Sequence, residues 1–550
     1  MTQPKGKFLI LQMGRLGDVA MTLAVLKRLK QETPCTITLA CFENFSALFE
    51  NCPEVDRLVT LPLILFPLLQ KYNGGEKDCG DPLASYPLLR EPYEHVINLT
   101  HNNESIFFDL NVDSGRVDTV RGEARCKGDW AKYLFAGYLD RRANQFNIVD
   151  LFQGMVGVAP TPVNAYIRPA PHQQEAFQQL LRQRGYRSPG KLVAFHIGSF
   201  RLHRAWPVER FAAMADQLIR GGKCEVVLLG SESERDLNSR FLAMVRHPII
   251  DMTGRTTSTE LAPLLQCCDL LVSNDTGPNH IAAAMGIPVL ALFFSTAYYA
   301  ETAPYGAGNT VLQSQLDCAP CLNYAECRRE SVCREPLTLE AVSAVAQALL
   351  AGESLAALHF PQVGIFQSRF LSNGTLAYLP VNDQNLSPST LGGIIRRLCW
   401  EAFWGWGPSW EEHRAYLGNP ARLPLLLQEC EKLRMKLAEA GRWLGQAQSA
   451  NRSILNMYAR SSVSLEALRL WQHLLESAVT GFCEALASEP LIYHFLQFEF
   501  TDMDYAAQPR LAELFENTLN KAKQMIERFL SVIEILEAWG KPQVKGPGER

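Results

Sequence analysis

The residues best suited to chemistry form the run Asp275-Thr276-Gly277-Pro278-Asn279-His280. An apolar stretch at 270–272 precedes it and predicts a buried strand, and a short helical pattern follows it. Pro278 suits the first position of that helix and Gly286 suits the position just after its end. The first N–H groups of a helix have no internal partner and carry the positive end of the dipole. At the carboxyl end of a parallel strand they predict an anion site suited to a diphosphate.

Thr276 and His280 lie four residues apart, so both can face one ligand. The alternative is a capped helix in any α/β domain, and the turn alone does not separate the two interpretations.

A second carboxylate lies in the loop Gly14-Arg15-Leu16-Gly17-Asp18, between an apolar strand pattern at 7–12 and a helical pattern that begins near Val19. Asp18 could cap that helix. It could also take a proton from a hydroxyl group, if the loop opens toward a cleft between domains. Glycines such as Gly17 let the backbone approach a ligand closely.

Two loops of the second half add polar groups. Ser199 follows the strand pattern 192–197, with Arg201, His203 and Arg204 close behind. Free N–H groups beside a guanidinium suit phosphate oxygens, although a solvated basic loop would have the same sequence. After the strand that ends at Gly230, Glu232 or Glu234 stands where doubly wound domains hold a ribose, and a surface glutamate is the alternative.

Four cysteines fall within sixteen residues: Cys318, Cys321, Cys327 and Cys333. Four thiolates suit tetrahedral ligation of a structural metal, with zinc the default and iron the rival. Free or disulfide-paired thiols are the alternative. Such a metal would staple the end of the second domain and take no part in catalysis.

Strand and helix patterns alternate from residue 7 to about 294, which predicts two doubly wound parallel sheets in tandem. Beyond about residue 350 the pattern changes. Alternating residues around Ser372-Asn373-Gly374 predict a β-hairpin. The stripes Leu426 to Leu444 and Leu511 to Leu536 then predict amphipathic helices of a bundle.

The bulk composition excludes several classes of protein. A net charge of −4 with no long basic run argues against nucleic-acid binding. The most apolar stretch, 61–69, is too short to span a bilayer, so it is buried or docks on a membrane surface or an apolar substrate. Fifteen cysteines in 550 residues, behind an N-terminus without a signal-peptide pattern, favour a reducing cytoplasm.

Taken in order, these motifs resemble the ADP-heptose:lipopolysaccharide heptosyltransferase family, glycosyltransferase family 9. The matching segments are Leu9 to Leu11 with Gly14 to Asp18, Arg204 to Pro207, Gly254 with Thr256 to Leu261, Asp275 to His280, Ala283 to Phe294, and the cysteines at 318 and 321. The resemblance covers roughly residues 5 to 350. It implies the GT-B architecture, in which two Rossmann-like domains face each other and the second holds most of the donor.

The resemblance also assigns roles. Asp18 would be the general base for inverting attack. Arg204, at a position where relatives often have lysine, would stabilise the diphosphate leaving group. Donor contacts are implied for Gly17, Ser199, Glu234, Asp275, Thr276, Gly277 and His280. No metal is implied for the transfer itself. Four-cysteine metal fingers occur in some relatives that glycosylate proteins.

We therefore expect an N-terminal Rossmann-like acceptor domain (1–165), a Rossmann-like donor domain (166–350) with the cysteine loop 318–333, a β-hairpin and linker (351–390), and a mostly α-helical extension (391–550). The expected activity is a cytoplasmic glycosyltransferase that moves heptose from ADP-heptose to a lipopolysaccharide or protein acceptor. The enzyme could also touch the inner membrane peripherally. The tail, about 200 residues long, would bind a protein acceptor or hold a homo-oligomer together. The rivals are a UDP-sugar epimerase or hydrolase of the same fold and a non-catalytic scaffold.

Overall fold

The computed structural model describes most of residues 6–63, 84–100 and 144–382, a strand at 117–119 with scattered positions up to 143, and most of 388–404, 423–459 and 508–540. The chain forms two compact units. The first comprises Met1–Leu134 and Phe146–Leu386, and the second comprises Phe135–Gln145 and Ser387–Arg550. The first unit therefore holds both predicted α/β domains, which we call the first and second lobes.

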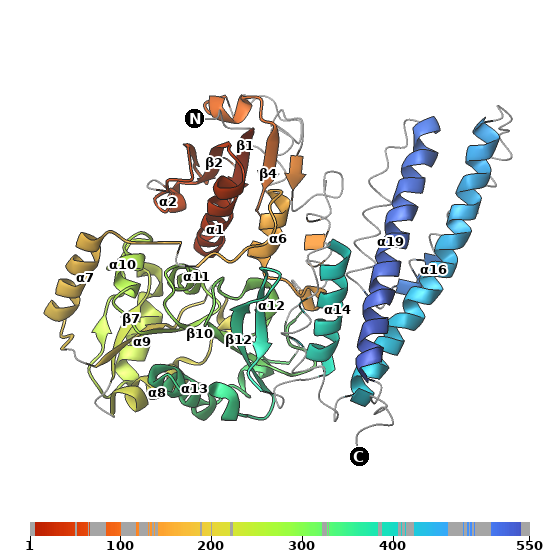
Figure 1. The fold of residues 1–550 in the computed structure, drawn as a ribbon. Helices are drawn as coiled ribbons and strands as arrows, with labels where there is room; N and C mark the ends of the chain where they lie inside the picture. The colour runs from red at the N-terminus through yellow and green to blue at the C-terminus, as the bar shows by residue number, and fades with distance from the viewer. Residues whose placement is uncertain are drawn as a thin grey trace, which may run out of the picture. The chain divides into compact units, whose positions relative to one another are not determined.

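The first lobe is built on a parallel sheet with strand order β3-β2-β1-β4-β5 (Figure 1). Its strands are β1 (Lys7–Gln12), β2 (Thr36–Phe42), β3 (Arg57–Leu61), β4 (His95–Asn98) and β5 (Val117–Thr119). Helix α1 (Leu16–Glu32) follows β1 directly, and α6 (Ile148–Met155) packs against α1. This strand order reverses direction between β1 and β4, and in doubly wound sheets such a switch point is where ligands bind.

The second lobe contains an eight-stranded sheet with the order β13-β12-β11-β10-β9-β6-β7-β8. Its parallel strands are β6 (Lys191–His196), β7 (Cys224–Leu229), β8 (Ile250–Asp251), β9 (Leu270–Asn274), β10 (Val289–Phe293) and β11 (Thr310–Ser314). When these six strands are numbered along the chain, their order across the sheet is 3-2-1-4-5-6, as in dinucleotide-binding sheets. The expected pair of Rossmann-like domains is confirmed, with a second switch point between β6 and β9.

The predicted hairpin is present as β12 (Val363–Phe370) and β13 (Leu376–Pro380). It does not stand apart as a linker, because β12 pairs antiparallel with β11 and extends the second sheet. An uncovered edge of a parallel sheet has unpaired N–H and C=O groups, and the hairpin satisfies those of β11. No pattern in the sequence marks β11 as a strand, so its pairing with the hairpin was not predicted.

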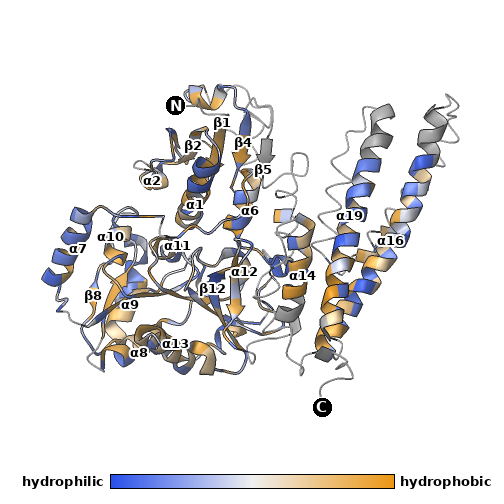
Figure 2. Ribbon diagram, viewed as in Figure 1, coloured by the Kyte–Doolittle hydropathy of each residue, from blue (hydrophilic) through white to orange (hydrophobic). Residues whose placement is uncertain are grey.

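Helices cover the second sheet in the usual alternation: α8 (Val208–Arg220), α9 (Arg235–Met244), α10 (Leu261–Leu265), α11 (Gly277–Ala284), α12 (Tyr299–Thr302) and α13 (Leu339–Ala351). Helix α7 (Pro171–Gln183) lies near the predicted boundary between the two lobes, where we predicted no helix. It is hydrophilic along most of its length and buries only Phe177 and Leu181, which explains why its sequence resembles a linker (Figure 2).

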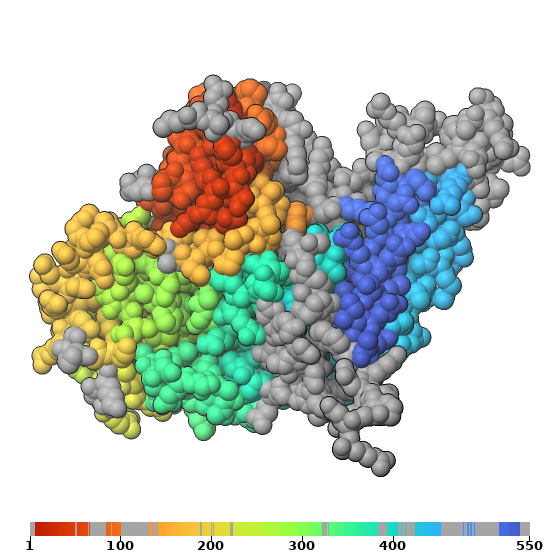
Figure 3. Space-filling view, viewed as in Figure 1, coloured from red at the N-terminus to blue at the C-terminus, as the bar shows by residue number. Residues whose placement is uncertain are grey.

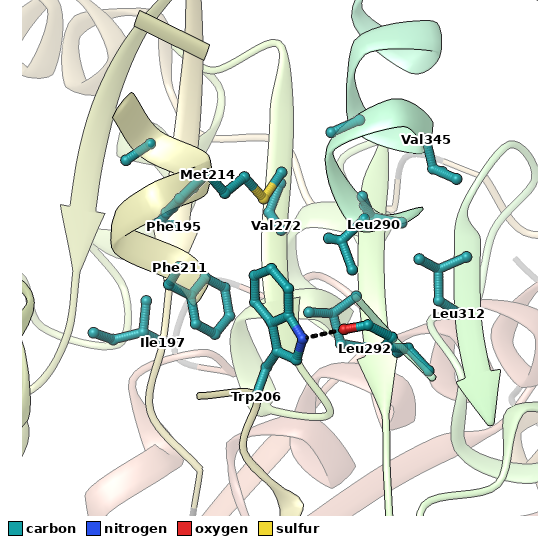
Figure 4. Close-up of a cluster of buried hydrophobic side chains, with 14 of the residues drawn as sticks. Phe195, Ile197, Trp206, Phe211, Met214, Val272, Leu290, Leu292, Leu312 and Val345 are labelled. Atoms are coloured by element: carbon teal, nitrogen blue, oxygen red, sulfur yellow. Dashed lines mark hydrogen bonds between the residues drawn. The ribbon is translucent and has the colours of Figure 1, made fainter. Parts of the chain in front are cut away.

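The core of the second lobe gathers around the buried indole of Trp206, which is 2% exposed. Phe211 packs edge-on against it, and Phe195 packs edge-on against Phe211 (Figure 4). The indole N–H donates to the carbonyl of Leu337 at 2.7 Å, so its polar atom is satisfied within the core. This anchor matters for function because Trp206 follows the predicted catalytic Arg204 by two residues.

The second unit is helical, as expected, with α14 (Pro388–Trp404), α16 (Leu423–Ala459) and α19 (Gln508–Gly540). These three helices pack on one another. The predicted stripe of α16, from Leu426 to Leu444, is buried, as is that of α19 from Leu519 to Leu536. The side chains of Leu511 and Phe515 lie outside the described residues. Figure 2 shows the mixture of hydrophobic and hydrophilic residues along both long helices.

We predict that Gly374→Ala destabilises the first unit by at least about 2 kcal/mol, because left-handed backbone disfavours alanine and a clash adds to this cost. Gly374 has φ +86°, and an added Cβ would lie 2.3 Å from the carbonyl oxygen of Pro160. The matched control is Gly352→Ala, with φ +70° but open space around the Cβ, which should cost about 1 kcal/mol. Urea unfolding monitored by tryptophan fluorescence compares the two. Equal losses would contradict the proposed clash.

Candidate functional site

The candidate site lies at the carboxyl ends of β6 and β9, which are neighbours in the second sheet. Strand β9 is buried over its whole length and ends at Asn274. Asp275 and Thr276 form the turn, and α11 begins at Gly277 with Pro278 in its first turn. The predicted strand, turn and helix are therefore present at the switch point of the second lobe.

Asn274, which is fully buried, organises this edge. Its amide donates to the carbonyls of Ile197 and Gly198 at 2.9 and 3.1 Å, and its side-chain oxygen accepts from the backbone N–H of Trp206 at 2.9 Å. Its own carbonyl accepts from the Asn279 amide at 2.7 Å. The side chain of Asn274 thus holds both ends of the loop 197–206, and its backbone carbonyl holds the start of α11. The sequence alone did not predict this role, because no sequence pattern distinguishes an asparagine that bonds to a distant loop from any other asparagine before a turn.

His196 closes β6 and is 8% exposed. Its Nδ1 lies 3.2 Å from the Thr276 hydroxyl, and its Nε2 lies 3.5 Å from Glu234 Oε1. The ring therefore bridges two side chains that the sequence predicts as donor contacts. The sequence alone did not predict a role for this histidine.

Glu234 belongs to a short 3₁₀ helix, η6 (Glu232–Glu234), and its Oε2 accepts from the N–H and the hydroxyl of Ser231, both at 2.8 Å. Burial works against the charged form, but the hydrogen bonds from His196 and Ser231 outweigh it and lower the pKa of Glu234 to about 2. Glu234 also lies against Gly198, where an added Cβ would be 1.7 Å from Oε1. Because residue 198 is a glycine, the Glu234 carboxylate can lie against the loop that follows β6.

Arg204, the predicted catalytic cation, pairs with Asp275, and both side chains are largely buried. Its Nε is buried and has no hydrogen-bond partner among the residues that the structure describes. Burial and the nearby charges of Arg201, Arg204 and Arg334 lower the pKa of His203. The loop that ends at Trp206 therefore places a concentration of positive charge beside the turn at 275–276, as an anion site requires.

The two lobes meet at the N-termini of α1 and α11, which pack against each other. A Cβ on Gly17 would lie 2.8 Å from the His280 ring, and one on Gly277 would lie 3.0 Å from Leu16. His280 is buried, and its Nδ1 has no hydrogen-bond partner within the described part of the chain. Burial lowers the pKa of His280, opposed by the charges of Asp275 and Asp18. In the space-filling view the red first lobe and the yellow-to-green second lobe of this unit are in contact (Figure 3).

Asp18 is partly exposed in the first turn of α1, and its Oδ2 accepts from the backbone N–H of Arg15 at 2.8 Å. The helix-capping interpretation is thus correct. The catalytic interpretation keeps its geometric basis too, because the same carboxylate lies close enough to His280 to affect that pKa. The predicted base and the predicted diphosphate helix come from opposite lobes and meet at one place.

The four cysteines lie in one loop that is attached to the carboxyl end of β10, where the Cys321 N–H donates to the Ser295 carbonyl at 2.7 Å. Burial raises the pKa of Cys321, and the nearby thiols of Cys333, Cys327 and Cys318 raise it further. No group of three or more His, Cys, Asp or Glu side chains in the described part of the chain is arranged to hold a metal ion. The thiols therefore cluster without defining a metal centre, and the zinc or iron stays a prediction.

The structure thus brings most of the predicted site together. Gly17, Asp18, Gly277 and His280 form the junction of the lobes, Arg204 pairs with Asp275, and Thr276 connects through His196 to Glu234. Ser199 lies partly exposed in the same loop as Gly198. The cysteine loop lies at the same sheet edge and contributes no residue to these contacts.

Two Rossmann-like lobes that meet at the N-termini of α1 and α11 have the architecture of the GT-B class. Comparison with known proteins gives the family. The sequence pattern of glycosyltransferase family 9 (heptosyltransferase) matches residues 87–331. Lipopolysaccharide heptosyltransferase 2 of Escherichia coli K12 is 32% identical over 52% of this chain and 82% of its own length. Lipooligosaccharide heptosyltransferase 2 of Haemophilus influenzae is 26% identical over 51% of this chain and 81% of its own.

Among solved structures, the Escherichia coli ADP-heptose LPS heptosyltransferase II superposes with a TM-score of 0.48 at 20% identity, over 63% of this chain and 99% of that one. The chain belongs to glycosyltransferase family 9 and is an enzyme. This membership removes the scaffold and epimerase alternatives. Within the helices that the structure describes, none combines the length and apolarity needed to cross a membrane.

We predict that Gly198→Ala weakens nucleotide binding about tenfold or more, because the new methyl group would displace Glu234 and break its contact with His196. Binding is measured by calorimetry with ADP. The control is Gly445→Ala, where the added Cβ meets nothing within 4 Å and which should leave binding unchanged. Wild-type affinity in Gly198→Ala would show that Glu234 makes no contact with the ligand.

Proposed function

We propose that this enzyme transfers a heptose from ADP-heptose to a lipopolysaccharide acceptor, with inversion at the anomeric carbon. The matched relatives are named as lipopolysaccharide or lipooligosaccharide heptosyltransferases, and this chain spans more than four-fifths of their length. The observation that carries the proposal is the contact between the N-termini of α1 and α11, because it brings the Asp18 carboxylate of one lobe to the anion site of the other.

The reaction follows from these groups. Asp18 accepts the proton of the acceptor hydroxyl while the oxygen of that hydroxyl attacks the anomeric carbon of the donor sugar. The bond from that carbon to the diphosphate oxygen breaks at the same time. ADP leaves with the bonding electrons and one more negative charge. The N–H groups at the start of α11 and the Arg204 guanidinium stabilise that charge. Since the chain supplies these positive groups itself, we propose a transfer step without a divalent cation.

Donor recognition extends along the same edge. Thr276, Gly277 and His280 would bind the diphosphate together with Ser199 and Gly17. Glu234, held charged and pointing into the loop at Gly198, would accept hydrogen bonds from ribose hydroxyls. Asp275 would hold Arg204 in place until the ligand arrives, since the two are paired in this structure.

The alignments with these relatives cover about half of this chain, and the family pattern ends at residue 331, before the second unit's long C-terminal part begins at Ser387. We propose that it binds the acceptor, either a lipopolysaccharide precursor or a protein, and that it also supports a homo-oligomer. A cytoplasmic location with peripheral contact to the inner membrane fits such an acceptor. A structural zinc or iron bound by Cys318, Cys321, Cys327 and Cys333 would stiffen the loop beside Ser295, and we propose no catalytic step that involves it.

Asp18→Asn should lower kcat by about 10²- to 10⁴-fold with little change in the dissociation constant of the donor. Asparagine can still accept the Arg15 N–H, so the cap of α1 survives while the base is lost. Transfer is measured by mass spectrometry of the acceptor, and donor binding by calorimetry.

The matched control is Asp56→Asn, a carboxylate of the same lobe that likewise accepts a backbone N–H, from Ile37 at 2.7 Å. It should transfer at the wild-type rate. Full activity in Asp18→Asn would exclude Asp18 as the base, and loss of donor binding would indicate a structural role instead.

A chain that ends at residue 386 should still bind ADP and lose transfer to the natural acceptor. The cut is placed there because β12 and β13 belong to the second sheet and the first unit reaches Leu386. Normal acceptor transfer by the shortened enzyme would refute an acceptor-binding tail. Loss of ADP binding would show instead that the second unit is needed to maintain the donor site.

A further inference from the structure

A chain of largely buried hydrogen bonds joins the two lobes through side chains that the proposed mechanism does not use. Asp150 on α6 and Tyr305, between α12 and β11, are both fully buried. The Tyr305 hydroxyl donates to Asp150 Oδ1 at 3.1 Å, and the backbone N–H of Leu376 on β13 donates to Oδ2 at 2.8 Å. Because α6 packs beside α1 in the first lobe (Figure 1), one carboxylate of that lobe takes two hydrogen bonds from the second.

The same chain continues from α6 to α1. Gln153 donates through Nε2 to the Tyr305 hydroxyl at 3.1 Å, and its Oε1 accepts the backbone N–H of Thr161 at 2.9 Å. The Thr161 side-chain oxygen accepts in turn from the Arg28 guanidinium of α1 at 3.1 Å. These bonds therefore connect β13 in the second lobe with the helix that carries Asp18 in the first.

Moving α6 away from the second lobe would be costly, because it would break this chain. A buried carboxylate needs hydrogen-bond donors in place of water, and leaving a buried polar group unsatisfied costs more than the bond itself contributes. Burial, together with the charge of Asp150, raises the pKa of Tyr305, so its hydroxyl keeps the hydrogen that it donates. Asn147, at the start of α6, adds a further bond to the second lobe, from its amide to the carbonyl of Ala303 at 2.8 Å.

The position of α6 bears on catalysis because its neighbour α1 is a single helix from Leu16 to Glu32. Arg28 lies about ten residues beyond Asp18, which is about 15 Å along the helix axis. A tilt of the helix at Arg28 therefore displaces the carboxylate near its other end. Misplacing a catalytic group by about 1 Å can lower a rate by up to about a hundredfold.

We propose that Tyr305 and Asp150 are positioning residues for the transfer, which hold α1 so that Asp18 meets the anion site of the second lobe. This inference rests on the proposed function, since it requires Asp18 to act as the base. It goes further by assigning the alignment of that base to a buried network outside the proposed donor contacts.

The first test is Tyr305→Phe, which keeps the ring and removes the hydroxyl at the centre of the chain. We expect kcat, measured with ADP-heptose and a heptose-free lipopolysaccharide precursor, to fall about tenfold. The dissociation constant of ADP, measured by calorimetry, should stay within about twofold of the wild-type value, because most of the proposed donor contacts lie on the second lobe. Both are measured well below the melting temperature of the variant, where a residue that only stabilises the fold leaves kcat unchanged.

The matched control is Tyr93→Phe. Tyr93 is also buried, and its hydroxyl donates to the Leu88 carbonyl at 2.6 Å within the first lobe. The variant loses one hydrogen bond without touching the contact between the lobes, so its kcat should equal that of the wild type. If Tyr305→Phe does not fold, Thr161→Val applies the same test at the partly exposed end of the chain, where it removes the oxygen that Arg28 binds.

A double-mutant cycle shows whether Tyr305 acts through Asp18. In the Asp18→Asn enzyme the displaced side chain is no longer a base, so adding Tyr305→Phe should lower kcat by less than about twofold further. The same loss in both backgrounds would overturn the inference, as would a wild-type kcat in the folded Tyr305→Phe enzyme.

Weaker ADP binding with an unchanged kcat would also overturn it, because Tyr305 would then shape the donor site and not the position of the base. Failure of the wild type to transfer heptose, or full activity in Asp18→Asn alone, is a different result, since either would refute the proposed function on which the inference rests.

Discussion

The close packing of two helix N-termini, one from each lobe, is the constraint on which the site depends. Gly17 and Gly277 have no side chains because the other helix occupies that space. Two positive helix ends with a guanidinium beside them are unfavourable unless negative charge lies among them. The chain supplies that charge itself, through Asp18 on α1 and Asp275 against Arg204. An incoming diphosphate would therefore compete with Asp275 for Arg204. It would bind where the helix N-termini and the guanidinium already supply positive charge.

The second requirement is that the cationic loop and the diphosphate helix keep one geometry, and buried polar bonds provide it. The Asn274 side chain bonds to both ends of the loop 197–206, and its carbonyl holds Asn279. Trp206 then ties this loop to the core through its indole and the Leu337 carbonyl. Buried hydrogen bonds of this kind contribute modestly to stability when made and are costly to leave unmade. They therefore help to fix the position of Arg204, which lies in the short 3₁₀ helix Leu202–Arg204 of this loop.

Much of the fold could be predicted, because buried parallel strands read as apolar runs and their helices as stripes. The misses have physical causes. Helix α7 has a hydrophilic sequence, and β11 carries no signal that would show the hairpin adding to its edge. Within the site, the turn 275–280 could be predicted because the start of a helix has a characteristic sequence pattern. The pairing of Arg204 with Asp275 and the bridge made by His196 could not, because each joins residues more than 35 positions apart that only the folded sheet brings together.

The second unit is not a simple C-terminal addition, because the segment Phe135–Gln145 of the N-terminal half belongs to it. Within that unit Arg397 donates to the Gln145 carbonyl and to Glu401, and Glu401 accepts from both the N–H and the hydroxyl of Ser409. A buried ion pair of this kind contributes little net stability, and its best-attested use is to fix one arrangement among several. We infer that it holds the backbone at Gln145 against α14. The chain therefore leaves the first unit after Leu134, returns to it at Phe146 and leaves it again after Leu386, so three covalent crossings join the two units.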